Sequence, residues 1–210
     1  MNARSETRLS TWLFDPFLYL AGAKALLIGW MAILLAGLLG ALSRTHFDGV
    51  LDIHTGLSVS LWFFVCEGFI AWLCLSVTLI IAGKLTAHGA FRVVDVAGTQ
   101  ALARWPTIIV SLITLAPGHQ RFTTYLKDHV LTQGGNINFF SPDAFVFLIV
   151  VLVTIVITCW MVFLMYKAYS VSCNVTGVRA VFPFIVAMFA AEICSKAVLY
   201  WLLSNTRQIG

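Results

Sequence analysis

Three charged residues lie deep inside long apolar stretches of the sequence, where ionised side chains are costly. Glu67 lies within residues 57–83, and Glu192 and Lys196 lie within residues 180–204. A charge at the centre of a membrane-spanning helix costs about 2.5–3.5 kcal/mol on insertion scales, so each of the three needs a partner or a function. Glu192 precedes Lys196 by four residues, which is the favourable order for an ion pair on one helix face.

Two interpretations of these charges remain open, because Glu67 has no partner at helical spacing on its own stretch. We expect Glu67 either to reach Lys196 or to remain protonated in the apolar interior. In one interpretation, Glu67, Glu192 and Lys196 form the proton or ion relay of a small transporter or channel. In the other, they form an internal ion pair that fixes how the helices pack.

A second polar group, made of Arg92, Asp95, Gln100 and Arg104, lies in a segment that mixes polar and apolar residues. This pattern is typical of a helix at the membrane surface, and we predict that it forms a docking surface for other proteins on the inner face. Contact between the basic side chains and lipid headgroups explains the same pattern equally well. Pro106 follows two residues after Arg104 and predicts a kink, because proline removes a backbone N–H from the helix.

Two imidazoles and two carboxylates lie within nine residues of one another, between the first and second apolar stretches. His46, Asp48, Asp52 and His54 are chemically able to hold Zn²⁺ or another divalent metal. Their spacing matches no established metal signature, and an Asp-Gly pair is also typical of a turn in a hydrated loop. We therefore expect no metal centre and no cofactor, and these four residues are the candidates if a metal does bind.

The sequence contains none of the motifs that mark common catalytic sites. G-x-S-x-G, the P-loop, the dinucleotide-binding glycine motif and H-E-x-x-H are all absent. The five cysteines include no C-x-x-C pair, which argues against a disulfide framework or a zinc site built from thiolates. We predict a protein that is not an enzyme.

The elements that must position these residues follow from composition. Of the 210 residues, 60% are hydrophobic and 10% are charged, and the mean hydropathy is +0.93. Soluble domains average about 25% charged residues, so a soluble enzyme is excluded, and the small basic excess is no sign of nucleic-acid binding. We predict a single membrane domain, residues 1–210, embedded in the lipid bilayer. Its expected spans are residues 18–43, 57–83, 96–116, 144–166 and 180–204.

These stretches are too long for barrel strands and lack strict alternation, so the predicted fold class is all-α: a polytopic bundle of five transmembrane helices. Basic residues are more numerous on the side of the N-terminus and of the second and fourth loops. This excess predicts an N-terminus inside and a C-terminus outside. The larger set is Arg4, Arg8, Lys84, Arg92, Lys167 and Arg179, and the smaller set is Arg44, Arg121, Lys127 and Arg207.

Small residues repeat at four-residue spacing on the first and fifth stretches. Such stripes let helices approach closely, either within the bundle or in a homo-oligomer. The first stripe is Ala32, Ala36 and Gly40, and the second is Ala187, Ala191 and Ser195.

Two polar segments carry a family resemblance. Residues 83–106, GKLTAHGAFRVVDVAGTQALARWP, resemble the central region of the Yip (Rab-GTPase-interacting) family, in its bacterial branch. Residues 168–180, AYSVSCNVTGVRA, are similar to the inner loop before that family's last helix. The resemblance spans about residues 57–203, and residues 46–56 also look like the bacterial subgroup.

The resemblance implies five helices and a cytoplasmic N-terminus, and places the chain in a bacterial inner membrane. Eukaryotic relatives bind small GTPases, act in vesicle traffic and shape membranes. Their N-terminal Asp-Leu-Tyr-Gly motif is absent here, so the resemblance does not extend to small-GTPase binding. We expect a non-enzymatic membrane scaffold or adaptor whose partners are other membrane proteins or a second copy of the chain. The transporter or channel is the alternative.

Overall fold

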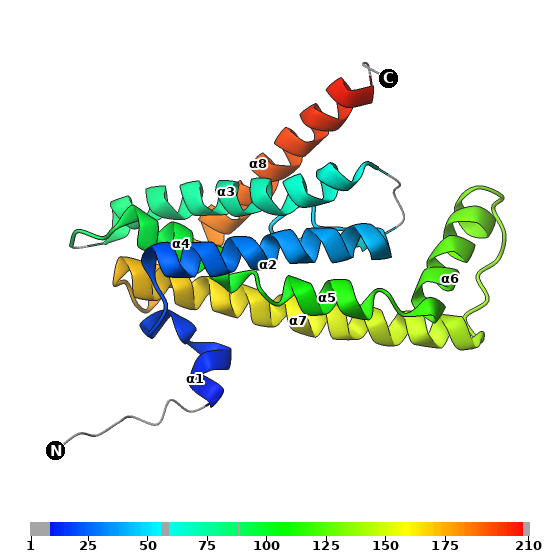
Figure 1. The fold of residues 1–210 in the computed structure, drawn as a ribbon, viewed down its shortest axis with the longest axis horizontal. Coiled ribbons are helices and arrows are strands. Elements are labelled where there is room, and N and C mark those ends of the chain that lie inside the picture. The colour runs from blue at the N-terminus through cyan, green and yellow to red at the C-terminus, as the bar shows by residue number, and fades with distance from the viewer. Residues whose placement is uncertain (1–8, 56–58, 88, 208–210) are drawn as a thin grey trace.

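The computed structural model describes residues 9–55, 59–87 and 89–207. This part of the chain is almost entirely helical (Figure 1). The elements before the third apolar stretch are α1 (Leu9–Phe14), η1 (Pro16–Leu18), α2 (Gly22–Ser43), β1 (Thr45–His46), β2 (His54–Thr55) and α3 (Leu61–Thr86). The remaining elements are α4 (Val93–Ala103), α5 (Thr107–Ile113), α6 (Pro117–Tyr125), η2 (Leu126–Leu131), α7 (Pro142–Cys173) and α8 (Val178–Arg207).

Five helical stretches are long and apolar enough to cross a bilayer, as the sequence predicts. They are Gly22–Ser43, Leu61–Thr86, Val93–Ile113, Pro142–Cys173 and Val178–Asn205. Many of their outward-facing side chains are large and apolar, which suits contact with lipid rather than water. Together these features indicate a multi-pass integral membrane protein, and they confirm the all-α fold class.

Most predicted boundaries differ from the structure by a few residues, and two of these differences are explained by polar residues near the helix ends. The fourth stretch continues to Cys173 rather than ending at residue 166, since Lys167 forms an ion pair with Asp15 at 2.7 Å. The first long helix begins at Gly22, because Asp15 and Pro16 start the short η1 turn instead.

The third stretch is broken where proline predicts a kink. α4 ends at Ala103 and α5 begins at Thr107, with Pro106 between them. Proline has no backbone N–H to donate and crowds the preceding turn, so one continuous helix is not available to this stretch. The break places Arg104 in the core of the bundle rather than on its surface. Arg104 is only 2% exposed.

α2 packs against α3, α4 and α5, and α4 also contacts α3. α7 runs along α4 and α5, and α8 crosses α3 obliquely (Figure 1). α2 and α4 approach closely at Gly29, where an added Cβ would lie 2.3 Å from the backbone carbon of Ala101. Both stripes of small residues are buried within the chain, so they pack the bundle itself.

The connection between α2 and α3 folds back into the bundle. β1 and β2 form a short antiparallel hairpin that pairs Thr45 with Thr55 and His46 with His54. Phe47 is 4% exposed, so the loop contributes side chains to the core. The expectation of a hydrated loop is therefore wrong for residues 46–50, because the apolar side chains of this part are buried in the bundle.

Candidate functional site

Glu67 is bound by the loop that follows β1. The carboxylate of Glu67 lies in the second turn of α3, and its Oε1 is 2.7 Å from His46 Nδ1. Its Oε2 accepts a hydrogen bond from the backbone N–H of Phe47 at 3.2 Å. The side chains of His46 and Glu67 are each 1% exposed, so this pair is fully enclosed. The expectation that Glu67 reaches Lys196 is wrong, because the loop supplies its partners.

Glu192 binds the next part of the same loop. One carboxylate oxygen of Glu192 accepts hydrogen bonds from the backbone N–H groups of Val50 at 2.6 Å and Leu51 at 3.0 Å. Gly49 lies against the carboxylate, where an added Cβ would sit 2.4 Å from Oε1. The absence of a side chain at Gly49 is therefore what lets the loop reach α8.

Arg104 holds the loop from a third direction. One terminal nitrogen of its guanidinium donates to the backbone carbonyl of Gly49 at 3.3 Å. Arg104 and Gln100 are both buried, and Gln100 donates to the backbone carbonyl of Met165 at 2.9 Å. These two residues are therefore removed from the predicted docking surface, which retains Arg92 and Asp95.

Lys196 connects α8 to the outer part of the loop. Its Nζ lies 2.5 Å from Asp52 Oδ2 and 3.5 Å from Glu192 Oε1. The predicted Glu192–Lys196 pair thus exists, but the shorter contact is to Asp52. A single ammonium group bridges two carboxylates from different elements, so its removal would affect both.

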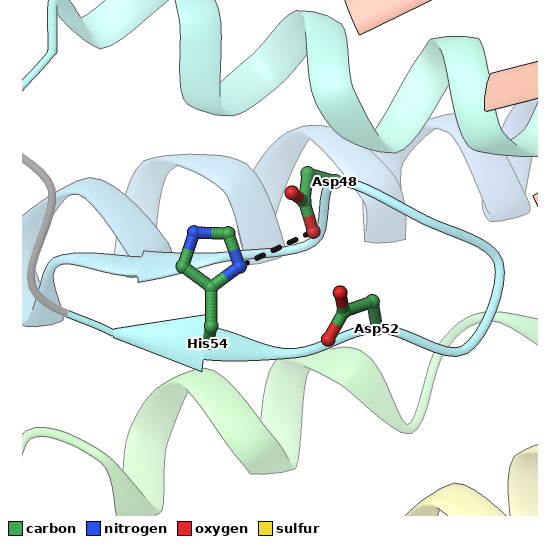
Figure 2. Close-up of side chains that lie close together, drawn as sticks. All are labelled: Asp48, Asp52 and His54. Carbon is green, nitrogen blue, oxygen red and sulfur yellow. Dashed lines mark ion pairs between the residues drawn. The ribbon is translucent and has the colours of Figure 1, made fainter. Parts of the chain in front are cut away.

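Three of the four candidate metal ligands lie together on this loop (Figure 2). Asp48, Asp52 and His54 each offer one ligand atom, and these atoms lie within 4.8 Å of one another. His54 Nδ1 is 3.3 Å from Asp48 Oδ1. His46, the fourth candidate, instead binds Glu67, and its ring stacks on that of His54 with centroids 5.0 Å apart.

The electrostatics of the cluster favour the ionised form of Asp48. Burial opposes ionisation of Asp48, but contact with His54 and the charge of Lys196 outweigh it and lower the pKa of Asp48 below its ordinary value. Contact with Asp48 raises the pKa of His54 against the opposing effect of burial, and the charges of Asp52 and Glu67 add to the rise.

Sequence reasoning identified the charges but not what they bind. Glu67 comes from α3, Glu192 from α8 and Arg104 from the turn between α4 and α5, and all three contact the segment between residues 46 and 51. Each of them makes a contact with a backbone atom, which leaves no residue-type signal. The sequence did contain one signal for these contacts: the predicted spans contain more charged residues than can pair with one another within the spans.

The fold and this loop together define a class, the multi-pass membrane protein with a loop held inside its helical bundle. Comparison with known proteins adds no narrower identity: no protein-family model, no curated protein and no solved structure matches the chain.

Proposed function

We propose that this chain is a non-enzymatic membrane scaffold or adaptor of the Yip-like type, in which the intramembrane charges hold a loop in place. The proposal rests on one observation: the same loop, residues 46–51, is contacted by Glu67, Arg104 and Glu192. Buried charges with specific partners fix a geometry, and removing one partner of such a pair is strongly destabilising. A rigid display surface is what a scaffold requires.

Transport is the competing function, and the His46–Glu67 contact is the observation in its favour. A buried imidazole–carboxylate pair can pass a proton, and it lies next to His54 near the loop surface. Along α3, however, the next buried polar side chain toward the far end of the helix is Ser76. Nine residues of helix correspond to about 13.5 Å, which is too far for direct proton transfer along this helix.

A flux measurement separates the two functions. The purified chain is reconstituted into liposomes containing a pH-sensitive dye, and proton flux is driven by a potassium diffusion potential. We expect no flux above that of empty liposomes for the wild type or for Glu67→Gln. Flux in the wild type that Glu67→Gln abolishes would establish transport and refute the scaffold.

The scaffold itself is tested at the part of the docking surface that stays exposed. Arg92 and Asp95 form a loose ion pair at 3.8 Å, and the side chain of Arg92 is 76% exposed. A photo-crosslinking residue at Val93, which is 50% exposed, is expected to give a discrete protein adduct in native membranes. The matched control is Val156, which is 68% exposed on α7 and is expected to give lipid adducts only. The same adduct pattern at both positions would count against an adaptor.

The proposed location is a bacterial cytoplasmic membrane, with the N-terminus inside and the loop of residues 44–55 outside. The helix ends at the α3–α4 connection and those near β1 and α6 lie at opposite ends of the bundle (Figure 1). In a cysteine-free background, Lys127→Cys should react with a membrane-impermeant thiol reagent in intact cells. Lys84→Cys should react only after the membrane is permeabilised, and the reverse pattern would invert the topology.

A further inference from the structure

The hairpin loop carries a set of donor atoms that is already close to the geometry of a metal site. Asp48 follows β1, Asp52 lies in the turn and His54 lies in β2, so the hairpin brings the three side chains to one side (Figure 2). Their ligand atoms are within 4.8 Å of one another. Ligands of one tetrahedral Zn²⁺ lie about 3.4 Å apart, given bonds of about 2.0–2.2 Å, so small side-chain rotations would suffice.

One of the donor atoms, Asp48 Oδ1, is poorly satisfied by the protein alone. It is shielded from solvent yet makes no well-aligned hydrogen bond with any residue that the structure describes. Its ion pair with His54 Nδ1 is long, at 3.3 Å. A buried acceptor left in this state is costly, and a cation between Asp48 and His54 would remove the cost.

The loop is held rigidly enough to preorganise the donors. Glu192 anchors the backbone between Asp48 and Asp52, and Glu67 anchors it just before Asp48. The ring of His46, fixed by Glu67, stacks on the ring of His54 and limits its rotation. Supporting contacts of this kind are what orient metal ligands in known sites.

Lys196 neutralises the carboxylate of Asp52, and the carboxylate of Glu192 is a second partner within reach. Its Nζ is 2.5 Å from Asp52 Oδ2 and 3.5 Å from Glu192 Oε1. A shift of the ammonium toward Glu192 frees Asp52 without leaving Lys196 unpaired. A bound metal ion can therefore replace the ammonium group of Lys196 as the cation next to Asp52.

We propose that Asp48, Asp52 and His54 bind one divalent transition-metal ion, with Zn²⁺ as the best match to the donors. Two carboxylates neutralise the charge of the ion, and the imidazole selects Zn²⁺ over Ca²⁺ and Mg²⁺, which prefer oxygen ligands only. His46 is a positioning residue and not a ligand, because its ring is buried against Glu67 and the mutually close donor atoms belong to Asp48, Asp52 and His54. The site is independent of whether the chain acts as a scaffold or as a transporter.

The test is metal binding by the full chain in detergent after treatment with a chelator. Titration with Zn²⁺, followed by calorimetry and by elemental analysis, should give about one equivalent bound to the wild type, and Ca²⁺ should not compete. His54→Ala and Asp48→Asn should each weaken binding by about tenfold or more. The matched controls are His129→Ala and Asp128→Asn, which alter exposed residues of η2 outside the cluster and should leave binding unchanged.

A variant that is expected to bind Zn²⁺ more tightly distinguishes loss of the metal site from loss of the fold. Lys196→Met removes the competing ammonium and should tighten Zn²⁺ binding by about threefold or more. A gain at a stoichiometry of one, with the helical circular-dichroism signal of the wild type retained, is not explained by loss of fold and would support the site directly. The proposal is overturned if the wild type binds no stoichiometric Zn²⁺, or if His54→Ala binds Zn²⁺ as tightly as His129→Ala does.

Discussion

Gly49 offers the sharpest test of how the loop is held. A methyl group at this position would lie 2.4 Å from Glu192 Oε1 and 2.7 Å from Oε2, well inside van der Waals contact. The backbone of Gly49 is not in the left-handed region, so Gly49→Ala introduces no backbone strain. The whole effect of the substitution must therefore come from displacing the carboxylate of Glu192.

The size of the effect follows from what the carboxylate binds. Glu192 accepts hydrogen bonds from the N–H groups of Val50 and Leu51, and it also contacts Lys196. Hydrogen bonds to charged groups contribute about 1.5–3 kcal/mol each, so loss of one or both costs roughly 2–5 kcal/mol. For a chain of this size a loss of 1 kcal/mol lowers Tm by about 2–4 °C, so Gly49→Ala should lower Tm by roughly 5–20 °C.

The assay is thermal unfolding of the purified protein in detergent, read by circular dichroism. Gly89→Ala is the matched control, because an added Cβ there meets nothing within 4 Å. The decisive comparison is a double-mutant cycle with Glu192→Ala, which removes the clash. Gly49→Ala should cost little stability in the Glu192→Ala background. An equal cost in both backgrounds, or a Tm equal to that of Gly89→Ala, would refute the anchoring role of Glu192.

Three further outcomes test other parts of the structure by the same unfolding measurement. Burial lowers the pKa of His119, so the unfolded chain takes up a proton below about pH 6.5 that the folded chain does not; stability should fall between pH 7.5 and 5.5, and less so in His119→Asn. Ser141 accepts a hydrogen bond from the N–H of Ala144 at the start of α7, so Ser141→Ala should cost about 1 kcal/mol, whereas an unchanged Tm would exclude a capping role. Gly29→Ala places a Cβ 2.3 Å from the backbone of Ala101 and should prevent α2 from packing on α4; a normal Tm would contradict this contact.

The helices were predictable because their signals are local. α7 combines a long charge-free run with a capping Ser141 followed by Pro142, and the structure shows both the helix and the cap. The break before α5 follows from Pro106 for an equally local reason. Exact ends were less predictable, since the extension of α7 past Lys167 depends on a contact with Asp15, which is distant in the sequence.

The loop was not predictable because its contacts are distant and partly made by backbone atoms. Glu192 meets Val50 across 142 positions, and nothing in the residue type of Val50 marks its N–H as the partner. Arg104 was placed on the surface because it belongs to a segment that mixes polar and apolar residues, a pattern typical of a helix at the membrane surface. The structure buries it because the turn at Pro106 points its side chain toward Gly49.

Counting the charges in the predicted spans nevertheless indicates that a connecting segment must enter the bundle. Within the apolar stretches Glu192 can pair with Lys196, and Lys24 lies close enough to the end of its stretch to reach the membrane surface. Glu67 and Arg104 are left without a partner on their own stretches. Unpaired charges are not retained in a bilayer core, so polar groups must be brought to them from a connecting segment. The segment between the first two spans contains two histidines and two aspartates within nine residues. A loop that must enter the bundle to satisfy buried charges brings its own polar residues with it, and Asp48, Asp52 and His54 are the ones that do not anchor it to Glu67, Arg104 or Glu192. The proposed metal site is formed by these three side chains, and Lys196 of α8 already occupies Asp52 with a cation that a metal ion can replace.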